Sequence, residues 1–340
     1  MRVLVTGGTG LIGKTTCEHM LIKGWQVRTL DLTLLKEPDD IEHVQGDILH
    51  FDALLKAMEG CDAVIHLAAL RSPTMAQASS VFQVNAAGTF NVFEAAAKTG
   101  IHRVVQASSI NAYGFYYGTV EHAPRYLPVD EDHPTLTTDP YSFSKQIDES
   151  IGAYFWRRDG ISSTALRFPA VLSPGYGERE DVQARRSEAR QTVDDLAALP
   201  VGKRRAQMAR LRKMDRAWRA GRPFDYRPNE SPLTALFESA ETLFRIFEFD
   251  RPNFWAALDV RDAAQSIEKS LTAAYEGAHA LFINDRRNYL GYDGRALARL
   301  FFPNVRRYTA DLSGPAALVS IERSRSLIGF EPEYAVASGG

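Results

Sequence analysis

Short apolar runs alternate with longer amphipathic stretches over the first half of the chain. The runs are rich in Val, Ile, Leu and Thr, and a stretch of helical length precedes or follows each one. We expect strands at Arg2–Thr6, Gln26–Asp31, Asp62–Leu67, Arg103–Ala107 and Ser162–Arg167. Apolar strands separated by helices are typical of a parallel sheet that is buried on both faces. The pattern runs from residue 2 to about 168 and predicts a doubly wound α/β domain.

The pattern changes after Pro169, where Pro174, Gly175 and Gly177 predict a break. Two amphipathic helices are expected next, with apolar stripes of Val193, Leu196 and Ala197 and of Met208, Leu211, Met214 and Trp218. Irregular pieces follow: a helix with Leu236, Leu243 and Ile246, a strand over Phe254–Leu258, a helix over Asp262–Tyr275, a strand over His279–Asn284, a helix near Asp293–Phe301 and a loose tail from Ala335 to Gly340. They are too few for a second sheet domain, so we expect a cap over the carboxyl ends of the strands.

Composition and charge exclude several classes of protein. The chain has 340 residues, 45% of them hydrophobic and 24% charged, with 40 Lys and Arg against 42 Asp and Glu. These values exclude a disordered chain, a collagen-like repeat and a disulfide scaffold, and they give no reason to expect a nucleic-acid or membrane partner. The chain has two cysteines, no apolar run of about 18 residues and a first strand that starts at Arg2. We therefore expect a cytoplasmic protein.

One segment differs in charge from the rest. Residues 178–228 hold 14 basic and 8 acidic side chains, a net +6, which leaves −8 on the remainder. Arg185, Arg186 or Arg190 could bind an anionic part of a substrate, or the segment could be a solvated helical surface. Acidic residues interrupt it and aromatic side chains do not interleave with it, which argues against nucleic acid.

A glycine-rich turn follows the first strand. Residues 3–13, VLVTGGTGLIG, run in the order strand, turn, helix. Glycine is needed because the turn adopts backbone angles that a Cβ would hinder, and because the main chain must approach a pyrophosphate at the positive end of the helix. Gly13 would let that helix pack closely on the strand. The turn therefore predicts a dinucleotide-binding site.

Two carboxylates are placed for the adenosine half of such a nucleotide. Asp31 ends the second strand, where it would accept hydrogen bonds from both ribose hydroxyls and repel a 2′-phosphate. NAD is therefore expected rather than NADP. Arg28 lies two residues earlier on the strand, and we do not expect it to bind the 2′-phosphate of NADP. Asp47 follows a third strand and could reach the adenine amine, or it could simply form a turn.

A tyrosine and a lysine one helical turn apart carry the candidate chemistry. A helix opens after Pro140, and the spacing of four places Tyr141 and Lys145 on one face. The ammonium group favours the phenolate, which would make Tyr141 a usable acid or base. Alone, the pair could be an ordinary surface pair. Ser108 and Ser109, at a strand end in the crevice where such sheets bind ligands, add a hydroxyl for the same substrate oxygen.

Together these residues resemble a known family. The motifs are Thr6-Gly7-x-x-Gly10-x-x-Gly13, Asp31, Asp47-Ile48, His66-Leu67-Ala68-Ala69, Asn85, Ser108-Ser109 with Ala112-Tyr113-Gly114, Tyr141-x-x-x-Lys145 and Arg167. They occur in the order found in the extended short-chain dehydrogenases/reductases. The chain resembles their NAD-dependent epimerase/dehydratase group, which includes UDP-glucose 4-epimerase and uronate dehydrogenase. The resemblance covers residues 1–170 well and 254–330 loosely, and its motifs are specific for cofactor and fold rather than for substrate.

The resemblance implies a role for each matched residue. Tyr141 would be the general base, Lys145 would lower its pKa and hold the nicotinamide ribose, and Ser109 would be the hydroxyl partner. His66 would be structural, and no residue is assigned to a metal. NAD would be bound by Gly7, Gly10, Leu11, Ile12, Gly13, Asp31, Asp47, Ile48, Leu67, Ala68, Ala69, Arg71, Asn85, Tyr141 and Lys145.

Differences from the family motifs restrict the reactions and substrates that we expect. Ile110 and Asn111 follow Ser109 where the dehydratases carry acidic residues, so dehydration is not expected. Ala170 stands where many epimerases have an Asn that binds the substrate diphosphate, which puts a UDP-sugar in doubt without excluding it. The loop before Tyr141 holds aromatic side chains that could stack on a sugar or pack on the domain: Tyr113, Phe115, Tyr116, Tyr117 and Tyr126.

These observations predict a Rossmann-type doubly wound parallel sheet with a smaller, mostly helical C-terminal substrate cap. We expect an NAD-binding domain with the catalytic residues over 1–170, a substrate cover with the basic helical insert over 171–253, and a mixed part over 254–334 that completes the sheet and the cap. The resemblance also implies a homodimer built on a four-helix bundle, for which Ala86, Ala87, Ala95, Ala96 and Ala97 are small enough.

The expected function is NAD-dependent oxidation of a hydroxyl of a sugar or sugar derivative, with a small carbohydrate substrate that is anionic or neutral. Epimerisation and net oxidation both stay open at this point. UDP-sugar 4-epimerase is one alternative. A non-catalytic NAD-binding scaffold or sensor is another.

Overall fold

The structure is a computed structural model that describes residues 1–34, 40–228 and 240–336. In this part of the chain, seven parallel strands form one sheet in the order β10-β7-β5-β4-β1-β2-β3. Their bounds are Arg2–Thr6 (β1), Gln26–Asp31 (β2), Ile41–Gln45 (β3), Ala63–His66 (β4), Arg103–Ser109 (β5), Ser162–Phe168 (β7) and Ala278–Phe282 (β10). The strand order turns back between β1 and β4, which makes the sheet doubly wound. The predicted fold class is confirmed.

The central strand β1 shows why these runs form strands. Val5 of β1 is paired with Thr29 of β2 on one side and with Ile65 of β4 on the other. Val3, Leu4 and Val5 are completely buried. A strand that is covered on both faces needs apolar side chains at successive positions, which is the pattern seen here.

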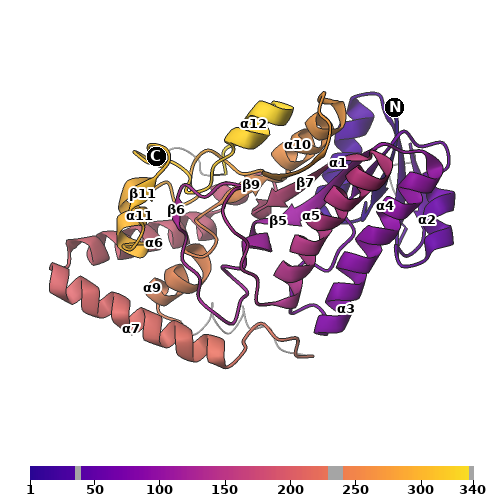
Figure 1. The fold of residues 1–340 in the computed structure, drawn as a ribbon. Helices are drawn as coiled ribbons and strands as arrows, with labels where there is room; N and C mark the ends of the chain where they lie inside the picture. The colour runs from indigo at the N-terminus through magenta and orange to yellow at the C-terminus, as the bar shows by residue number, and fades with distance from the viewer. Residues whose placement is uncertain (35–39, 229–239, 337–340) are drawn as a thin grey trace.

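Helices cover both faces of the sheet. Helices α1 (Leu11–Ile22) and α10 (Val260–Thr272) lie on one face, where Met20 and Ile267 are buried in a shared core with β1. Helices α2 (Phe51–Met58), α4 (Gly88–Thr99) and α5 (Pro140–Asp159) lie on the other face, as Figure 1 shows. The short α3 (Ala78–Phe82) and a π-helical turn (Gln83–Ala87) lead into α4.

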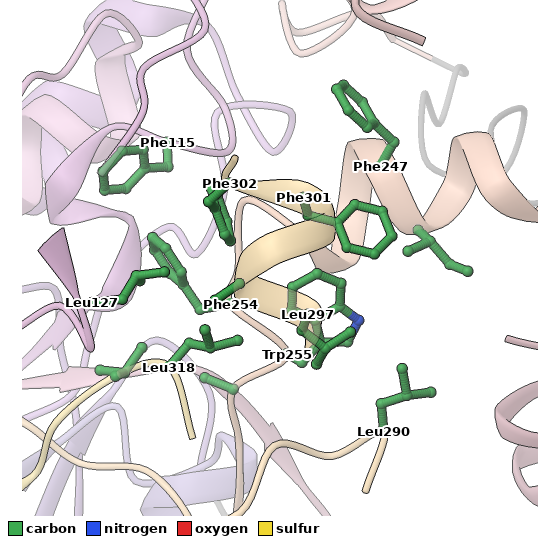
Figure 2. Packing of buried hydrophobic residues seen from close by; sticks show 14 of the residues in the cluster. Phe115, Leu127, Phe247, Phe254, Trp255, Leu290, Leu297, Phe301, Phe302 and Leu318 are labelled. Carbon is green, nitrogen blue, oxygen red and sulfur yellow. The ribbon is translucent and has the colours of Figure 1, made fainter. Parts of the chain in front are cut away.

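The cap has a hydrophobic core of its own. It is built from α6 (Glu180–Ala198), α7 (Val201–Ala220), α9 (Thr242–Arg245), a π-helical turn (Ile246–Asp250) and α11 (Gly294–Phe301). Short strand pairs join it to the sheet domain: β6 (Tyr126–Leu127) with β11 (Arg307–Tyr308), and β8 (Ala170–Leu172) with β9 (Ala257–Asp259). Figure 2 shows the core, in which the Trp255 and Phe301 rings lie 5.2 Å apart between centroids.

The basic segment forms the two predicted helices, α6 and α7, on the side of the molecule away from α2 (Figure 1). Of the predicted stripes, Val193, Leu196, Met208 and Leu211 are buried, and Met214 and Trp218 pack against the same core. None of the helices in the described ranges is long and apolar enough to cross a membrane. Both cysteines are free thiols.

Several predicted boundaries in the second half of the chain are wrong. The strand expected at Phe254–Leu258 is Ala257–Asp259, because Phe254 and Trp255 have φ of +56° and +50°, which breaks the extended chain. The helix expected over Asp262–Tyr275 runs over Val260–Thr272, and the strand expected over His279–Asn284 runs over Ala278–Phe282.

The tail is also more ordered than expected at one position. Val336 is buried, its N–H donates to Asp285, and its carbonyl accepts from Arg186. Residues 337–340 of the predicted loose tail, and Leu236 of the predicted helix, lie outside the described residues.

Candidate active site

A cavity of about 450 Å³ lies where the carboxyl ends of the sheet strands meet the cap. Its walls include the glycine turn, the end of β5 and the start of α5, together with cap residues from 249 to 256 and at 289. The predicted site residues in these walls are Gly7, Gly10, Leu11, Ile12, Gly13, Leu67, Ala69, Arg71, Ser109, Tyr141 and Lys145. A larger hollow of about 810 Å³ near Asp62 and His102 contains none of them.

The glycines of the turn have two different tasks. Gly7 has φ of +76°, and a Cβ there would lie 2.6 Å from the Ala68 nitrogen. A Cβ on Gly13 would lie 2.2 Å from the Gly7 carbonyl oxygen, so both glycines are required by the fold itself. A Cβ on Gly10 would meet only the Gly7 carbonyl oxygen, at 3.5 Å. Gly10 therefore leaves space on the cavity side, which is where a ligand would approach the backbone.

The start of α1 suits an anion. The residue before the helix, Gly10, supplies no side-chain cap for the first-turn N–H groups of Leu11, Ile12 and Gly13. Uncapped N–H groups at the positive end of a helix are favourable partners for phosphate oxygens. The turn and the helix start therefore fit the pyrophosphate of a dinucleotide.

Asp31 is held at the edge of this turn. Its Oδ2 accepts hydrogen bonds from the N–H and the hydroxyl of Thr9, at 3.0 and 2.9 Å. Arg28 is turned away to other partners, since its guanidinium donates to the carbonyls of Ala57 and Glu59 and pairs with Glu42. The carboxylate thus stands next to the glycine turn without a basic side chain from its own strand.

Five of the expected cofactor residues lie outside the cavity walls: Asp31, described above, and the four that follow. The Asp47 carboxylate accepts from the Leu49 N–H, and Ile48 is buried against Gly88. The backbone of Ala68 packs against Gly7. Asn85 is buried and bonds both backbone groups of residue 70 as well as the hydroxyl of residue 144. Their assignment to NAD binding stays a prediction.

The sequence positions Tyr141 and Lys145 through the start of α5. Asp139 caps the helix by accepting the Ser142 N–H at 2.8 Å, and Pro140 occupies the first turn, where its missing N–H is harmless. Tyr141 lines the cavity. The Lys145 Nζ donates to the Ala107 carbonyl at 2.9 Å and to Asp148 at 3.0 Å.

Ser109 reaches the same place from the end of β5. Its hydroxyl accepts the Asn111 N–H at 3.1 Å, which holds the side chain in the turn that follows the strand. The hydroxyl also lies close enough to the Tyr141 phenol to lower the pKa of that phenol. The structure therefore brings Ser109, Tyr141 and Lys145 together, as the sequence predicted for them.

Burial changes the expected acidity of Tyr141. Burial raises the pKa of Tyr141, and the ammonium of Lys145 and the hydroxyl of Ser109 lower it by less. Lys145 acts in the predicted direction, because its ammonium lowers the pKa of the phenol, and burial acts against it. The role of Tyr141 as the base stays a prediction. The sequence does not reveal the burial of the phenol, because burial depends on the folded chain.

His66 has buried hydroxyl partners on both sides of its ring. Its Nδ1 lies 2.7 Å from the Thr6 hydroxyl, and its Nε2 lies 2.9 Å from the Thr89 hydroxyl. Burial lowers the pKa of His66 to about 3, and the charge of Lys145 adds to this effect. The ring is therefore a neutral link between β1, β4 and α4.

The aromatic loop divides into packing residues and cavity residues. Tyr113, Phe115 and Tyr126 are buried away from the cavity, whereas Tyr116 and Tyr117 line it. The Tyr117 ring stands edge-on to the Tyr141 ring, with 5.6 Å between centroids. Tyr117 is thus placed over the candidate base.

The arginines that the sequence singled out bind protein groups. Arg167 is buried and makes two hydrogen bonds to Glu149, at 2.8 and 2.7 Å. Arg185 pairs with Asp181, and Arg190 donates to the Leu290 carbonyl. In the described ranges, neither these side chains nor Arg186 form part of the cavity wall. Of the two alternatives for the basic segment, these contacts favour a helical surface over an anion site in this cavity.

Sequence reasoning missed polar residues that the fold brings to the cavity. Tyr289 donates its hydroxyl to Asp250, and both residues line the cavity beside Asn253. Burial raises the pKa of Asp250 to about 7, although the Tyr289 hydroxyl lowers it. Asp250 and Tyr289 are 39 residues apart and share no motif, so only the folded cap reveals them. Asp148, three residues after Lys145, could have been found from helical spacing.

Comparison with known proteins places the chain in a family. Residues 3–197 match the model of the NAD dependent epimerase/dehydratase family. The chain is 33% identical over 179 residues to L-arabinose 1-dehydrogenase (NAD(P)(+)) of Haloferax volcanii, covering 51% of this chain and 68% of that protein. It is 32% identical over 181 residues to UDP-glucose 4-epimerase of Bacillus subtilis, covering 49% and 51%. The match thus spans about half to two thirds of these relatives.

A solved structure shows the same fold over nearly the whole chain. The NAD complex of UDP-glucose 4-epimerase from Thermus thermophilus superposes with a TM-score of 0.58 at 19% identity, covering 98% of this chain and 95% of that one. The resemblance expected from the motifs is confirmed, since the family model covers more than half of the sequence. The chain belongs to the NAD dependent epimerase/dehydratase family.

Proposed function

We propose that this protein is an NAD-dependent oxidoreductase that oxidises a hydroxyl group of a sugar or sugar derivative. One observation carries the proposal: the Ser109, Tyr141 and Lys145 side chains share a single cavity with the glycine turn at the start of α1. The family to which the chain belongs supports it, as do the names of its relatives, which are sugar dehydrogenases and UDP-sugar epimerases. The free thiols of Cys17 and Cys61 support the expected cytoplasmic site of action, where thiols stay reduced.

In the proposed reaction, each of the site residues has a separate role. When bound, NAD supplies the hydride acceptor. Ser109 orients the substrate hydroxyl by hydrogen bonding, and Tyr141 accepts its proton. Lys145 is held by the Ala107 carbonyl and stabilises negative charge on the Tyr141 oxygen. The Tyr117 ring stands edge-on to the Tyr141 ring and supports it from the side of the loop.

The cofactor preference follows from Asp31. Thr9 fixes the orientation of the carboxylate beside the turn, and Arg28 is occupied elsewhere. A carboxylate at this place favours two free ribose hydroxyls and repels a 2′-phosphate, which supports NAD over NADP.

The cap side of the cavity suits a polyhydroxylated molecule. Asp250, Tyr289 and Asn253 offer hydrogen-bonding groups, and Phe249 with Tyr117 offers apolar surface. Sugars present both kinds of surface, because hydroxyl edges alternate with apolar C–H faces. Whether the keto product leaves or is reduced on its other face decides between dehydrogenase and epimerase.

Exposed aromatic rings support a homodimer. Phe82, Phe90, Phe143 and Tyr154 are each 39–45% exposed on α3, α4 and α5. Phe82 stacks with Phe143 and Phe90 stacks with Tyr154, which makes an apolar surface of the kind that a partner helix pair covers. The alanines first expected there contribute less, since Ala86, Ala95 and Ala96 are buried within the chain.

A screen of purified protein tests the proposal. Neutral aldoses, uronates and UDP-sugars are each incubated with NAD, and NADH formation and sugar interconversion are followed by absorbance and NMR. We expect one class to react. Stoichiometric NADH would identify a dehydrogenase, and interconversion without net NADH would identify an epimerase. A protein that binds NAD but turns over no member of the panel would favour the scaffold or sensor alternative.

A further inference from the structure

A buried carboxylate next to Lys145 has no role in the reaction described so far. Asp148 follows Lys145 by one turn of α5 and is 1% exposed. Its Oδ2 accepts a hydrogen bond from the Lys145 Nζ at 3.0 Å. Its Oδ1 is also buried and has no hydrogen-bond partner among the described residues. A carboxylate in this state is costly to bury, which suggests a function beyond packing.

The groups around Asp148 leave Lys145 as its main counter-charge. The Thr89 hydroxyl, from α4, lies against the carboxylate and stabilises its charge, although it does not form a regular hydrogen bond with Oδ1. Behind Thr89 lies His66 of β4, which burial keeps neutral. On α5, the negative charge of Glu149 acts on Asp148 from the next position, and the Glu149 carboxylate is engaged by Arg167.

The charge of Asp148 reaches Tyr141 in two ways. The carboxylate pairs with the ammonium that would otherwise stabilise the phenolate, and it adds its own repulsion. Both effects keep the proton on Tyr141. Burial raises the pKa of Asp148 to about 6, with Lys145 and Thr89 acting in the opposite direction, so the carboxylate is charged at neutral pH and above.

We propose that Asp148 is a positioning residue for the reaction proposed above, holding the Lys145 ammonium beneath the Ala107 carbonyl and offsetting part of its charge at Tyr141. The ion pair fixes the direction of the lysine side chain, which has many rotamers when free. The same pair makes deprotonation of Tyr141 less favourable in the open cavity, before the substrate arrives. Asp148, together with the Asp139 carboxylate that precedes the helix, therefore moves the pH range in which the candidate base works to higher values.

The test replaces Asp148 by asparagine, which keeps the shape and one acceptor for Lys145 but removes the charge. The full chain, labelled with ¹³C at the tyrosine Cζ, is titrated by NMR in the presence of NAD, and Tyr141→Phe assigns the signal of Tyr141. We expect Asp148→Asn to lower the pH at which Tyr141 titrates by about one unit, which is a tenfold change in the protonation equilibrium. The acid limb of the pH profile of kcat/KM should move in the same direction by a similar amount.

Asp159→Asn serves as the matched control, because Asp159 ends the same helix on the surface and pairs with Arg158. It should leave both titrations unchanged. The inference is overturned if Asp148→Asn leaves the Tyr141 titration unchanged or moves it to higher pH. It is also overturned if Tyr141 stays protonated in both proteins over the whole pH range in which they are folded. A shift in the NMR titration without turnover of any sugar would contradict the proposed function and leave the role of Asp148 standing.

Discussion

Replacing Glu248 by glutamine should flatten the dependence of the protein's stability on pH. Glu248 lies in the π-helical turn of the cap and is completely buried against Asp215 and Arg219 of α7. Arg219 also donates to the carbonyls of Tyr116 and Gly118, so the cluster ties α7 to the loop that carries Tyr117. Glutamine keeps the shape of Glu248 and removes its titration.

The magnitude follows from the proton balance. Burial, followed by the neighbouring Asp215, raises the pKa of Glu248 from 4.5 to about 9, although Arg219 lowers it. Between these two values the folded chain holds one proton more than the unfolded chain. The stability that Glu248 contributes is therefore fully present below about pH 4.5 and is lost as the pH rises through about 9. One proton corresponds to about 1.4 kcal/mol per pH unit, so the loss between pH 6 and pH 8 is at most about 3 kcal/mol.

Urea denaturation at pH 6 and pH 8 measures this loss in the unmodified chain and in Glu248→Gln. The unmodified protein should lose more free energy of unfolding between the two pH values than the variant does. Glu322→Gln is the control, because the Glu322 side chain is 73% exposed, and it should behave as the unmodified chain. Equal losses in Glu248→Gln and in the unmodified chain would refute the reasoning.

Three further predictions concern the cofactor and the assembly. Asp31→Ala should weaken NAD binding and reduce the preference for NAD over NADP in a titration of both, and an unchanged preference would contradict the role of this carboxylate. Gly13→Ala should lower the midpoint of thermal unfolding, because its Cβ would meet backbone at 2.2 Å, whereas Gly10→Ala should keep the midpoint and weaken NAD binding. If Gly13→Ala and Gly10→Ala lowered the midpoint of thermal unfolding equally, the two glycines would not have the separate roles described above. Phe143→Ser, with Phe90→Ser, should convert a dimer to a monomer in sedimentation velocity, and a dimer that persists would place the interface elsewhere.

The sheet could be predicted closely because its strands obey a local rule. A strand buried on both faces is apolar at successive positions, as β1 is. Both β1 and β2 begin and end where the runs of Arg2–Thr6 and Gln26–Asp31 do. The candidate catalytic residues were also found from local spacing, since Tyr141 and Lys145 lie on one turn of one helix.

The cap could be predicted only in outline, because its geometry depends on contacts between distant segments. The turn at Phe254 and Trp255 is stabilised by burial of both rings in the cap core, which no local propensity indicates. Asp250 meets Tyr289 across 39 residues, and the raised pKa of Tyr141 comes from burial by the folded chain. The spacing of Tyr141 and Lys145 predicted the direction in which the ammonium acts but not the opposing effect of burial, because spacing reports which groups are neighbours and not how far they are removed from water.

The central claim is that Tyr141 is the proton acceptor in an NAD-dependent oxidation, and the turnover of Tyr141→Phe tests it most directly. The variant keeps the ring against Tyr117 and removes only the hydroxyl, so it should still bind NAD, which a titration measures. With the substrate identified in the screen, we predict that kcat falls by a factor of about 100 or more. A variant that binds NAD normally and retains full turnover would contradict the account.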